Sequence, residues 1–174
     1  MPSHTSPPWR SEICASFHES WQRSRGFGAA SSAGFDPSTL GGVLRHFVIV
    51  GGRLEEAELR FRLEFLHPSV ERGLSAPILG TDVTSWIDPI LREAAYRGLK
   101  RAISDFRGIR LLAPLTLGNG PCWIETILLP LSLGVGGIRM VGVFESVRLL
   151  PQELAKHAYG IELPDQITFL ELDL

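Results

Sequence analysis

The chain has 174 residues, of which 44% are hydrophobic and 21% are charged, a balance typical of a single soluble globular domain. Its formal net charge of -2 excludes the strongly basic surface that binds nucleic-acid phosphates, so we expect no nucleic-acid partner. Its 2 cysteines exclude a disulfide framework, and its short, interrupted apolar runs exclude membrane insertion and a secretory signal, so we expect a cytoplasmic protein.

The N-terminal region predicts a tail, an amphipathic helix and a linker. Residues 1–10 are rich in proline and polar side chains and predict a flexible tail. Ser11 can cap the helix that follows, which we expect to end near Gly26. Residues 26–34 (GFGAASSAG) predict a linker, so that residues 11–34 form one unit of helix and linker. The apolar residues of the helix share one face: Ile13, Cys14, Phe17 and Trp21.

Residues 35–65 predict a short helix followed by two strands. Asp36-Pro37 combines a carboxylate cap with proline at the first helical position, which is typical of a helix start. The β-branched run His46–Val50 predicts a buried strand, and residues 57–65 alternate between apolar and charged side chains, which predicts a second strand. Its apolar face consists of Leu59, Phe61, Leu63 and Phe65.

The middle of the chain predicts helices. Residues 68–73 predict a short helix and Gly80–Asp82 a turn. Asp88-Pro89 repeats the cap and the proline, and begins a longer helix that we expect to end near Asp105. The apolar face of this helix consists of Ile90, Leu91, Ala94, Ala95, Leu99, Ala102 and Ile103.

Three further strands are predicted at residues 106–117, 122–133 and 138–149, separated by glycine-rich segments with hairpin chemistry. Residues 151–174 predict a C-terminal extension with a short helix and a final β-rich piece. The order of elements predicts an α+β fold: a five-stranded antiparallel sheet with helices on one face, preceded by an N-terminal amphipathic helix. Residues 35–150 would form this domain.

This order of elements resembles the PAS fold, and several short motifs resemble a PAS-like family common in alphaproteobacteria. The matching segments are Trp21–Gly26, Phe35–Pro37, Leu59–Leu63, Gly80–Thr84 and Ile127–Ser132. Each motif is short, so the resemblance rests on their order and spacing, over roughly residues 15 to 147 of the sequence. The chain departs from the family pattern in lacking small residues at Glu64-Phe65 and Ser85.

The resemblance implies a sensory or protein–protein signalling module without catalysis. A small apolar ligand or a partner protein would bind the inner face of the sheet, and the signal would pass to another polypeptide. The expected pocket residues are Leu63, Phe65, Trp86, Ile90, Tyr96, Trp123, Glu125, Ile127 and Leu129.

The N-terminal helix has two interpretations. Its face of Ile13, Phe17 and Trp21 can pack on a second chain, which predicts a homodimer, as flanking helices of PAS-like proteins commonly do. The same face can instead cover the chain's own sheet. We favour the homodimer.

Cofactor chemistry finds no support in the sequence. The 5 histidines form no pair at helical or zinc-ligand spacing, and the helix predicted at 88–105 has none to hold a haem. Neither Cys14 nor Cys122 lies in the Asn-Cys-Arg-Phe motif of flavin photosensors of this fold. We therefore expect no metal and no cofactor.

Glu125, between Ile124 and Thr126 in an apolar strand, has two interpretations as well. It can point into the pocket, where burial would raise its pKa, or it can be exposed or pair with Arg110 or Arg139 on a neighbouring strand. We favour the second. An alternative function, a small cone-shaped α+β enzyme with an acid or base in an apolar cavity, would need Glu125 to converge with Asp82 or His67.

Overall fold

The computed structural model describes residues 9–24, 37–72, 77–105, 107–115, 122–132, 138–153 and 167–170. The predicted linker, both predicted hairpin turns and most of the predicted tail and C-terminal extension lie outside the described residues, and the domain boundaries drawn from them stay predictions.

In the described part of the chain, six strands form one antiparallel sheet in the order β2-β1-β5-β4-β3-β6. The α+β class and the five-stranded antiparallel sheet are therefore confirmed, and β6 adds an edge strand beside β3. The first strand continues past its predicted end at Val50, through Gly51 and Gly52. The strands are β1 Phe47–Glu55, β2 Glu58–Leu66, β3 Gly108–Leu115, β4 Cys122–Ser132, β5 Ile138–Ser146 and β6 Ile167–Leu170.

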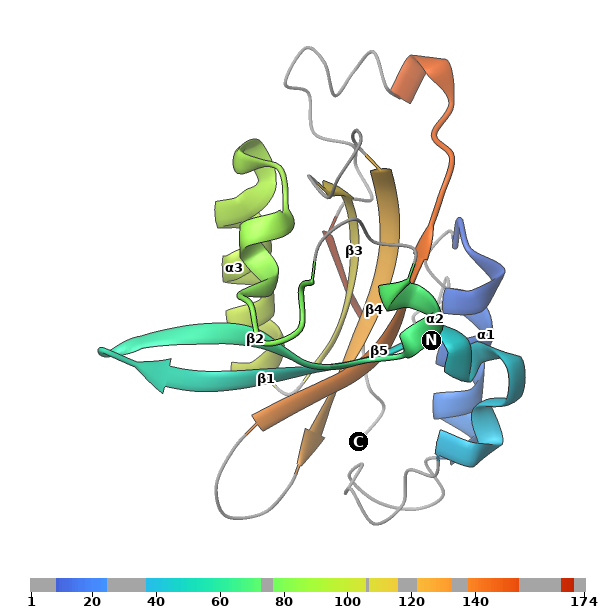
Figure 1. Ribbon diagram of the computed structural model, residues 1–174, viewed down its shortest axis with the longest axis horizontal. Helices are drawn as coiled ribbons and strands as arrows, with labels where there is room; N and C mark the ends of the chain where they lie inside the picture. The colour runs from blue at the N-terminus through green and yellow to red at the C-terminus, as the bar shows by residue number, and fades with distance from the viewer. Residues whose placement is uncertain are drawn as a thin grey trace, which may run out of the picture.

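Helices lie on both sides of this sheet (Figure 1). The segment between β2 and β3 places α3 and η2 over one face, and α1 lies with η1 over the other. The helices are α1 Glu12–Ser24, η1 Pro37–His46, α2 Pro68–Glu71, η2 Val83–Trp86 and α3 Pro89–Ser104. The N-terminal helix thus covers the face opposite the one roofed by the middle helices.

We name the two faces by their buried strand residues. The pocket face, under α3 and η2, includes Val48, Val50, Leu63, Leu111 and Leu128. The α1 face, under α1 and η1, includes Phe47, Ile127, Leu129, Val141 and Val143. Successive strand residues point to opposite faces, so one strand supplies both cores.

The predicted helix caps at Ser11 and Asp88 are present. Ser11 Oγ accepts hydrogen bonds from the backbone N–H groups of Ile13 at 3.1 Å and Cys14 at 3.2 Å. The Asp88 carboxylate accepts from the N–H of Ile90 at 2.9 Å. Each cap satisfies donors that a helix start leaves without an intrahelical partner, which explains where α1 and α3 begin.

A bulge in β2 changes the predicted alternation of that strand. Val50 pairs with Leu63 and Ile49 pairs with Phe65, so Glu64 is an extra residue. The insertion turns Phe65 away from the pocket face and toward Phe47, with ring centroids 6.1 Å apart. The prediction that Phe65 shares a face with Leu63 is therefore wrong.

Candidate functional site

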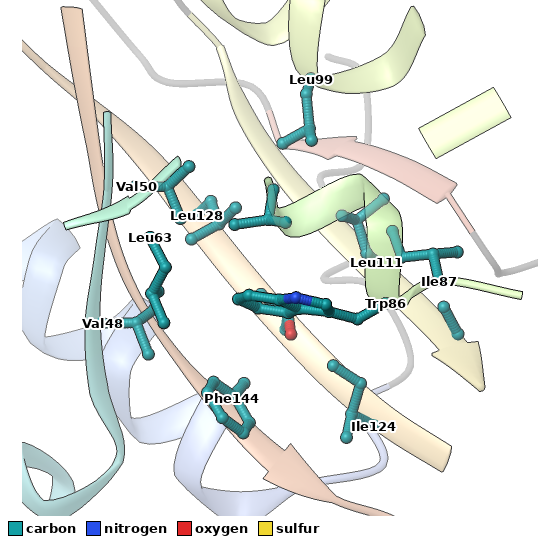
Figure 2. A pocket seen from close by; sticks show the side chains of 13 residues that line it. Val48, Val50, Leu63, Trp86, Ile87, Leu99, Leu111, Ile124, Leu128 and Phe144 are labelled. Atoms are coloured by element: carbon teal, nitrogen blue, oxygen red, sulfur yellow. The ribbon is translucent and has the colours of Figure 1, made fainter. Parts of the chain in front are cut away.

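An apolar pocket lies between the pocket face and the η2–α3 segment (Figure 2). About 60 Å³ of it is open to the centre of a sphere the size of a water molecule. An engineered apolar cavity of about 150 Å³ in another protein holds one benzene molecule, so the open space here is smaller than that. Its lining consists of Val48, Val50, Leu63, Val83, Trp86, Ile87, Leu99, Leu111, Ala113, Ile124, Thr126, Leu128 and Phe144.

Trp86 lies in the middle of the lining side chains, with Leu63 to one side of it and Ile87 to the other (Figure 2). Its Nε1–H donates to Thr81 Oγ1 at 2.9 Å, and that hydroxyl donates to the carbonyl of Ile78 at 2.7 Å. This bond satisfies the polar edge of the indole ring, so the apolar ring faces are left to contact the lining.

The helix that carries Trp86 is one short turn. Asp82 caps η2 by accepting from the N–H of Thr84 at 2.8 Å and from its hydroxyl at 2.6 Å. An isolated antiparallel bridge between Asp82 and Arg62 ties the start of η2 to β2. Its end is held as well, because the N–H of Asp88 donates to the carbonyl of Pro114 on β3 at 3.2 Å and Arg92 donates to the carbonyl of Ile87 at 3.3 Å. Trp86 therefore projects from a single short turn, whereas most other lining residues lie on strands or on α3.

The polarity of the pocket is low. Among the described residues that line it, Thr126 and the Trp86 indole are the only side chains with polar atoms, and none is charged. An ion without a partner in such a site would lose several kcal/mol of hydration energy, so the pocket suits a neutral and mostly apolar molecule.

Two of the predicted pocket residues, Leu63 and Trp86, line this pocket. Phe65 lies on the other side of the sheet because of the bulge at Glu64. Ile90 is 63% exposed at the start of α3, and Tyr96 packs its ring edge on Phe61 with centroids 5.8 Å apart. Neither Ile90 nor Tyr96 lines the pocket.

The remaining four predicted residues all lie on β4 and point to the α1 face: Trp123, Glu125, Ile127 and Leu129. The pocket is lined instead by the alternate set Ile124, Thr126 and Leu128. The predicted pocket residues of β4 therefore lie one position away from the residues that line the pocket. A strand covered on both faces carries apolar side chains at every position, so its pattern does not reveal which set faces which way.

Glu125 is fully buried on the α1 face and forms an ion pair with Arg110 of β3. The Arg110 Nε–H donates to Glu125 Oε1 at 2.5 Å, and neither side chain has any exposed area. The backbone N–H groups of Arg10 and Ser11 also donate to its Oε2, at 3.1 and 2.7 Å. The interpretation as an ion pair with Arg110 is confirmed, and the placement of Glu125 in the pocket is wrong.

The face of α1 proposed for a dimer is turned toward the chain's own sheet. Phe17 and Trp21 are 0% and 1% exposed and pack in the core of the α1 face, while Ile13 is half-buried beside them. A single chain therefore already covers this apolar face of the helix. The homodimer stays a prediction.

The residues required for the alternative enzyme do not converge. His67 caps α2, its Nδ1 accepting from the Ser69 N–H at 3.2 Å, and Asp82 caps η2. Glu125 lies on the opposite face of the sheet, against α1. These three groups share no cavity.

The described residues contain neither of two further kinds of site, a membrane-spanning helix or a metal centre. None of their helices is long and apolar enough to cross a membrane. The same residues hold no group of three or more histidine, cysteine, aspartate or glutamate side chains placed to bind a metal ion.

Comparisons with known proteins show similarity at the level of fold. No protein-family model matches the chain, and no curated protein does. The light-state structure of the blue-light photoreceptor Aureochrome1 LOV is 17% identical over 67% of this chain and 92% of that one, with a TM-score of 0.48. A fungal LOV domain photoreceptor is 14% identical over 72% of this chain and 86% of its own length, with a TM-score of 0.47.

A LOV domain from a flavin-analogue study is 13% identical over 70% of this chain and 89% of its own length, with a TM-score of 0.48. These scores identify no relative of this chain. Its own sheet carries the assignment: five antiparallel strands in the order β2-β1-β5-β4-β3, with η2 and α3 over one face, form a PAS-like fold.

Proposed function

We propose that the chain is a non-catalytic sensory module of the PAS type, which binds a small molecule in the pocket and passes the change to another polypeptide. The observation that carries the proposal is a pocket whose described lining residues are uncharged, between a hydrogen-bonded sheet and a short helical segment. A site of this kind selects ligands by shape and apolar contact, and the residues described in its lining include no carboxylate, histidine or cysteine for catalysis.

The short segment that roofs the pocket supplies the means of response. A ligand that contacts Trp86 changes the position of η2, which is tied to β2 through Asp82 and continues almost directly into α3. A ligand shifts a conformational equilibrium only as far as it binds one state better than the other, so contact with a movable element is required. The receiving polypeptide would be a signalling partner or a second copy of the chain.

The adjacent leucines of β4 provide a matched test of the site. Leu128 lines the pocket and Leu129 packs in the core of the α1 face, and they are 3% and 0% exposed. Replacing either by alanine costs about 2–5 kcal/mol of stability and leaves a cavity. Xenon, which binds dry apolar cavities, serves as the probe. In methyl NMR spectra of the wild-type chain, we expect xenon to shift the methyl signals of pocket residues.

We expect Leu128→Ala to enlarge those shifts and Leu129→Ala to leave them unchanged. Ala113→Leu fills the pocket from β3 and abolishes them, and this variant serves if the alanine variants do not fold. Equal xenon shifts at pocket methyls in the wild type and in Ala113→Leu would exclude this pocket as the site. Native mass spectrometry of protein purified from its own host then identifies the bound molecule and counts the subunits.

Membership of the alphaproteobacterial PAS-like family and a cytoplasmic location belong to the same proposal. The support for the family is the order of short motifs from Trp21–Gly26 to Ile127–Ser132 on a PAS-like sheet.

A further inference from the structure

The pocket holds one feature that narrows the chemistry of its ligand: its centre is taken by a flat aromatic side chain of the protein itself. Trp86 lies among the lining residues, and Leu63, Leu128 and Phe144 surround its ring in Figure 2. The lining is therefore shaped around a flat bicyclic ring. If the indole swings away, the space that it leaves has the outline of an aromatic molecule.

The open volume indicates that the indole must move for a ring to enter. About 60 Å³ is open beside Trp86, less than half of the engineered cavity of about 150 Å³ that holds benzene in another protein. A ring of benzene size or larger therefore displaces part of the lining. Most of the remaining lining residues lie on paired strands or on α3, whose backbones are fixed by hydrogen bonds.

Trp86 is the lining side chain whose release is easiest. It is half-buried, it projects from a single helical turn, and its indole N–H is bonded to the partly exposed Thr81. Turning it outward exchanges that hydrogen bond for one with water, which costs little, and exposes apolar ring surface, a cost that the ligand must offset by burying its own ring. The incoming molecule then packs against the same apolar side chains that the indole ring covered before.

The polar groups of the site limit the ligand further. The lining residues that the structure describes carry no charge, so a charged ring would lose its hydration without gaining a partner among them. Thr126, 8% exposed, supplies a hydroxyl from β4 that can both donate and accept one hydrogen bond. The Trp86 indole N–H is already bonded to Thr81.

We propose that the pocket binds a neutral, flat aromatic molecule of about indole size, which enters as the Trp86 side chain turns outward and whose single polar group bonds to Thr126. This inference rests on the proposed function, because it names the ligand class of the same pocket. Trp86 then fills the site when no ligand is bound, and its side chain moves when the ligand enters.

The test uses the full chain with indole, benzene, hexane and indole-3-acetate as probes, and contacts to Leu63 and Leu128 methyls locate each bound probe by NMR. We expect indole to bind the wild type, and the Nε1–H signal of Trp86 to shift as its bond to Thr81 breaks. Trp86→Ala removes the competing ring, so indole binds this variant at least about tenfold more tightly. Indole also raises the Tm of Trp86→Ala more than that of the wild type.

Thr126→Val keeps the shape of the side chain and removes its hydroxyl. We expect it to weaken indole binding by about two- to twelvefold, the effect of one ordinary hydrogen bond, and to change benzene binding less than twofold. Indole-3-acetate, which carries a charge on the same ring, binds at least tenfold more weakly than indole.

Three results would overturn the inference. If hexane or xenon enters the wild-type pocket and neither indole nor benzene does, the aromatic class is wrong while the proposed function stands. If indole binds the wild type and Trp86→Ala with equal affinity, Trp86 is not the group that the ligand displaces. If Trp86→Ala does not fold, an Nε1–H signal of Trp86 that does not shift in the indole-bound wild type leads to the same conclusion. If no probe enters, the proposed function fails together with the inference.

Discussion

Replacing Glu125 by glutamine removes one charge from an ion pair that has no access to water. Both side chains of the pair are 0% exposed, so the buried cation of Arg110 would lose the carboxylate of Glu125. Breaking such a pair on one side costs about 3–5 kcal/mol, because the remaining charge keeps its full desolvation penalty. The backbone N–H groups of Arg10 and Ser11 also lose their charged acceptor, so the start of α1 is weakened as well.

For a chain of this length about 1 kcal/mol corresponds to about 2–4 °C, so we expect Glu125→Gln to lower Tm by about 6–20 °C. Urea unfolding followed by tryptophan fluorescence gives the free energy directly. Amide hydrogen exchange in α1 should accelerate more than exchange in α3, since α3 packs on the other face.

Glu64 provides the matched control, because it also lies on a strand and pairs with arginines. Its carboxylate accepts from Arg139 Nε–H at 2.5 Å and from Arg53 at 3.3 Å, but those two side chains are 46% and 64% exposed. Glu64→Gln should therefore cost no more than about 1 kcal/mol. A loss of less than about 1 kcal/mol in Glu125→Gln would refute the reasoning. So would a double variant, Arg110→Leu with Glu125→Leu, that is less stable than Glu125→Gln, because an apolar pair removes both buried charges.

Three further predictions concern single positions. Burial holds the pKa of His18 below its usual 6.5, so the folded chain binds fewer protons than the unfolded chain just below that pH. As the pH is lowered from about 6.5 through the lowered pKa, the free energy of unfolding should decrease. His18→Gln should flatten this pH dependence in urea titrations. A Cβ added at Gly142 would lie 1.8 Å from the carbonyl oxygen of Ile127, so Gly142→Ala should cost about 3 kcal/mol or more in the same assay, and a near-neutral result would contradict the close strand approach. Burial, with the nearby Glu125 charge, raises the pKa of Cys14 to about 12, so a thiol reagent should modify only the exposed Cys122 in the folded chain and both thiols in urea.

Local chemistry in the sequence predicted the elements of this fold well. The caps at Ser11 and Asp88 act through their own neighbours, within two or three residues, so the sequence contains the whole interaction. The alternation of β2 held from Leu59 to Leu63, as far as strand pairing remained regular. It failed at Glu64, because a bulge depends on how two strands align and leaves little trace in one strand alone.

The position of α1 was beyond what the helix pattern determines. An amphipathic stripe of Phe17 and Trp21 requires an apolar surface to cover it, but the stripe is the same whether that surface belongs to its own sheet or to a second chain. The sheet decides the matter in the single chain, because its α1 face also carries a large apolar core that needs a cover. The requirement for a helix on this face becomes apparent only when the strands are assembled into the sheet, and the sequence of the helix does not contain it.

The orientation of β4 could have been deduced from one residue, Glu125. A carboxylate within an apolar strand needs a cationic partner, and Arg110 on the neighbouring strand was one of two candidates. If the two pair across strands, they share a face, and period two then assigns Ile127 to that face as well. The alternate residues, including Thr126, must face the other way, toward the pocket. The predicted pocket set ignored this constraint, because it placed Glu125 and its apolar neighbours in the pocket, whereas the charge of Glu125 indicates which face of the strand pairs with Arg110.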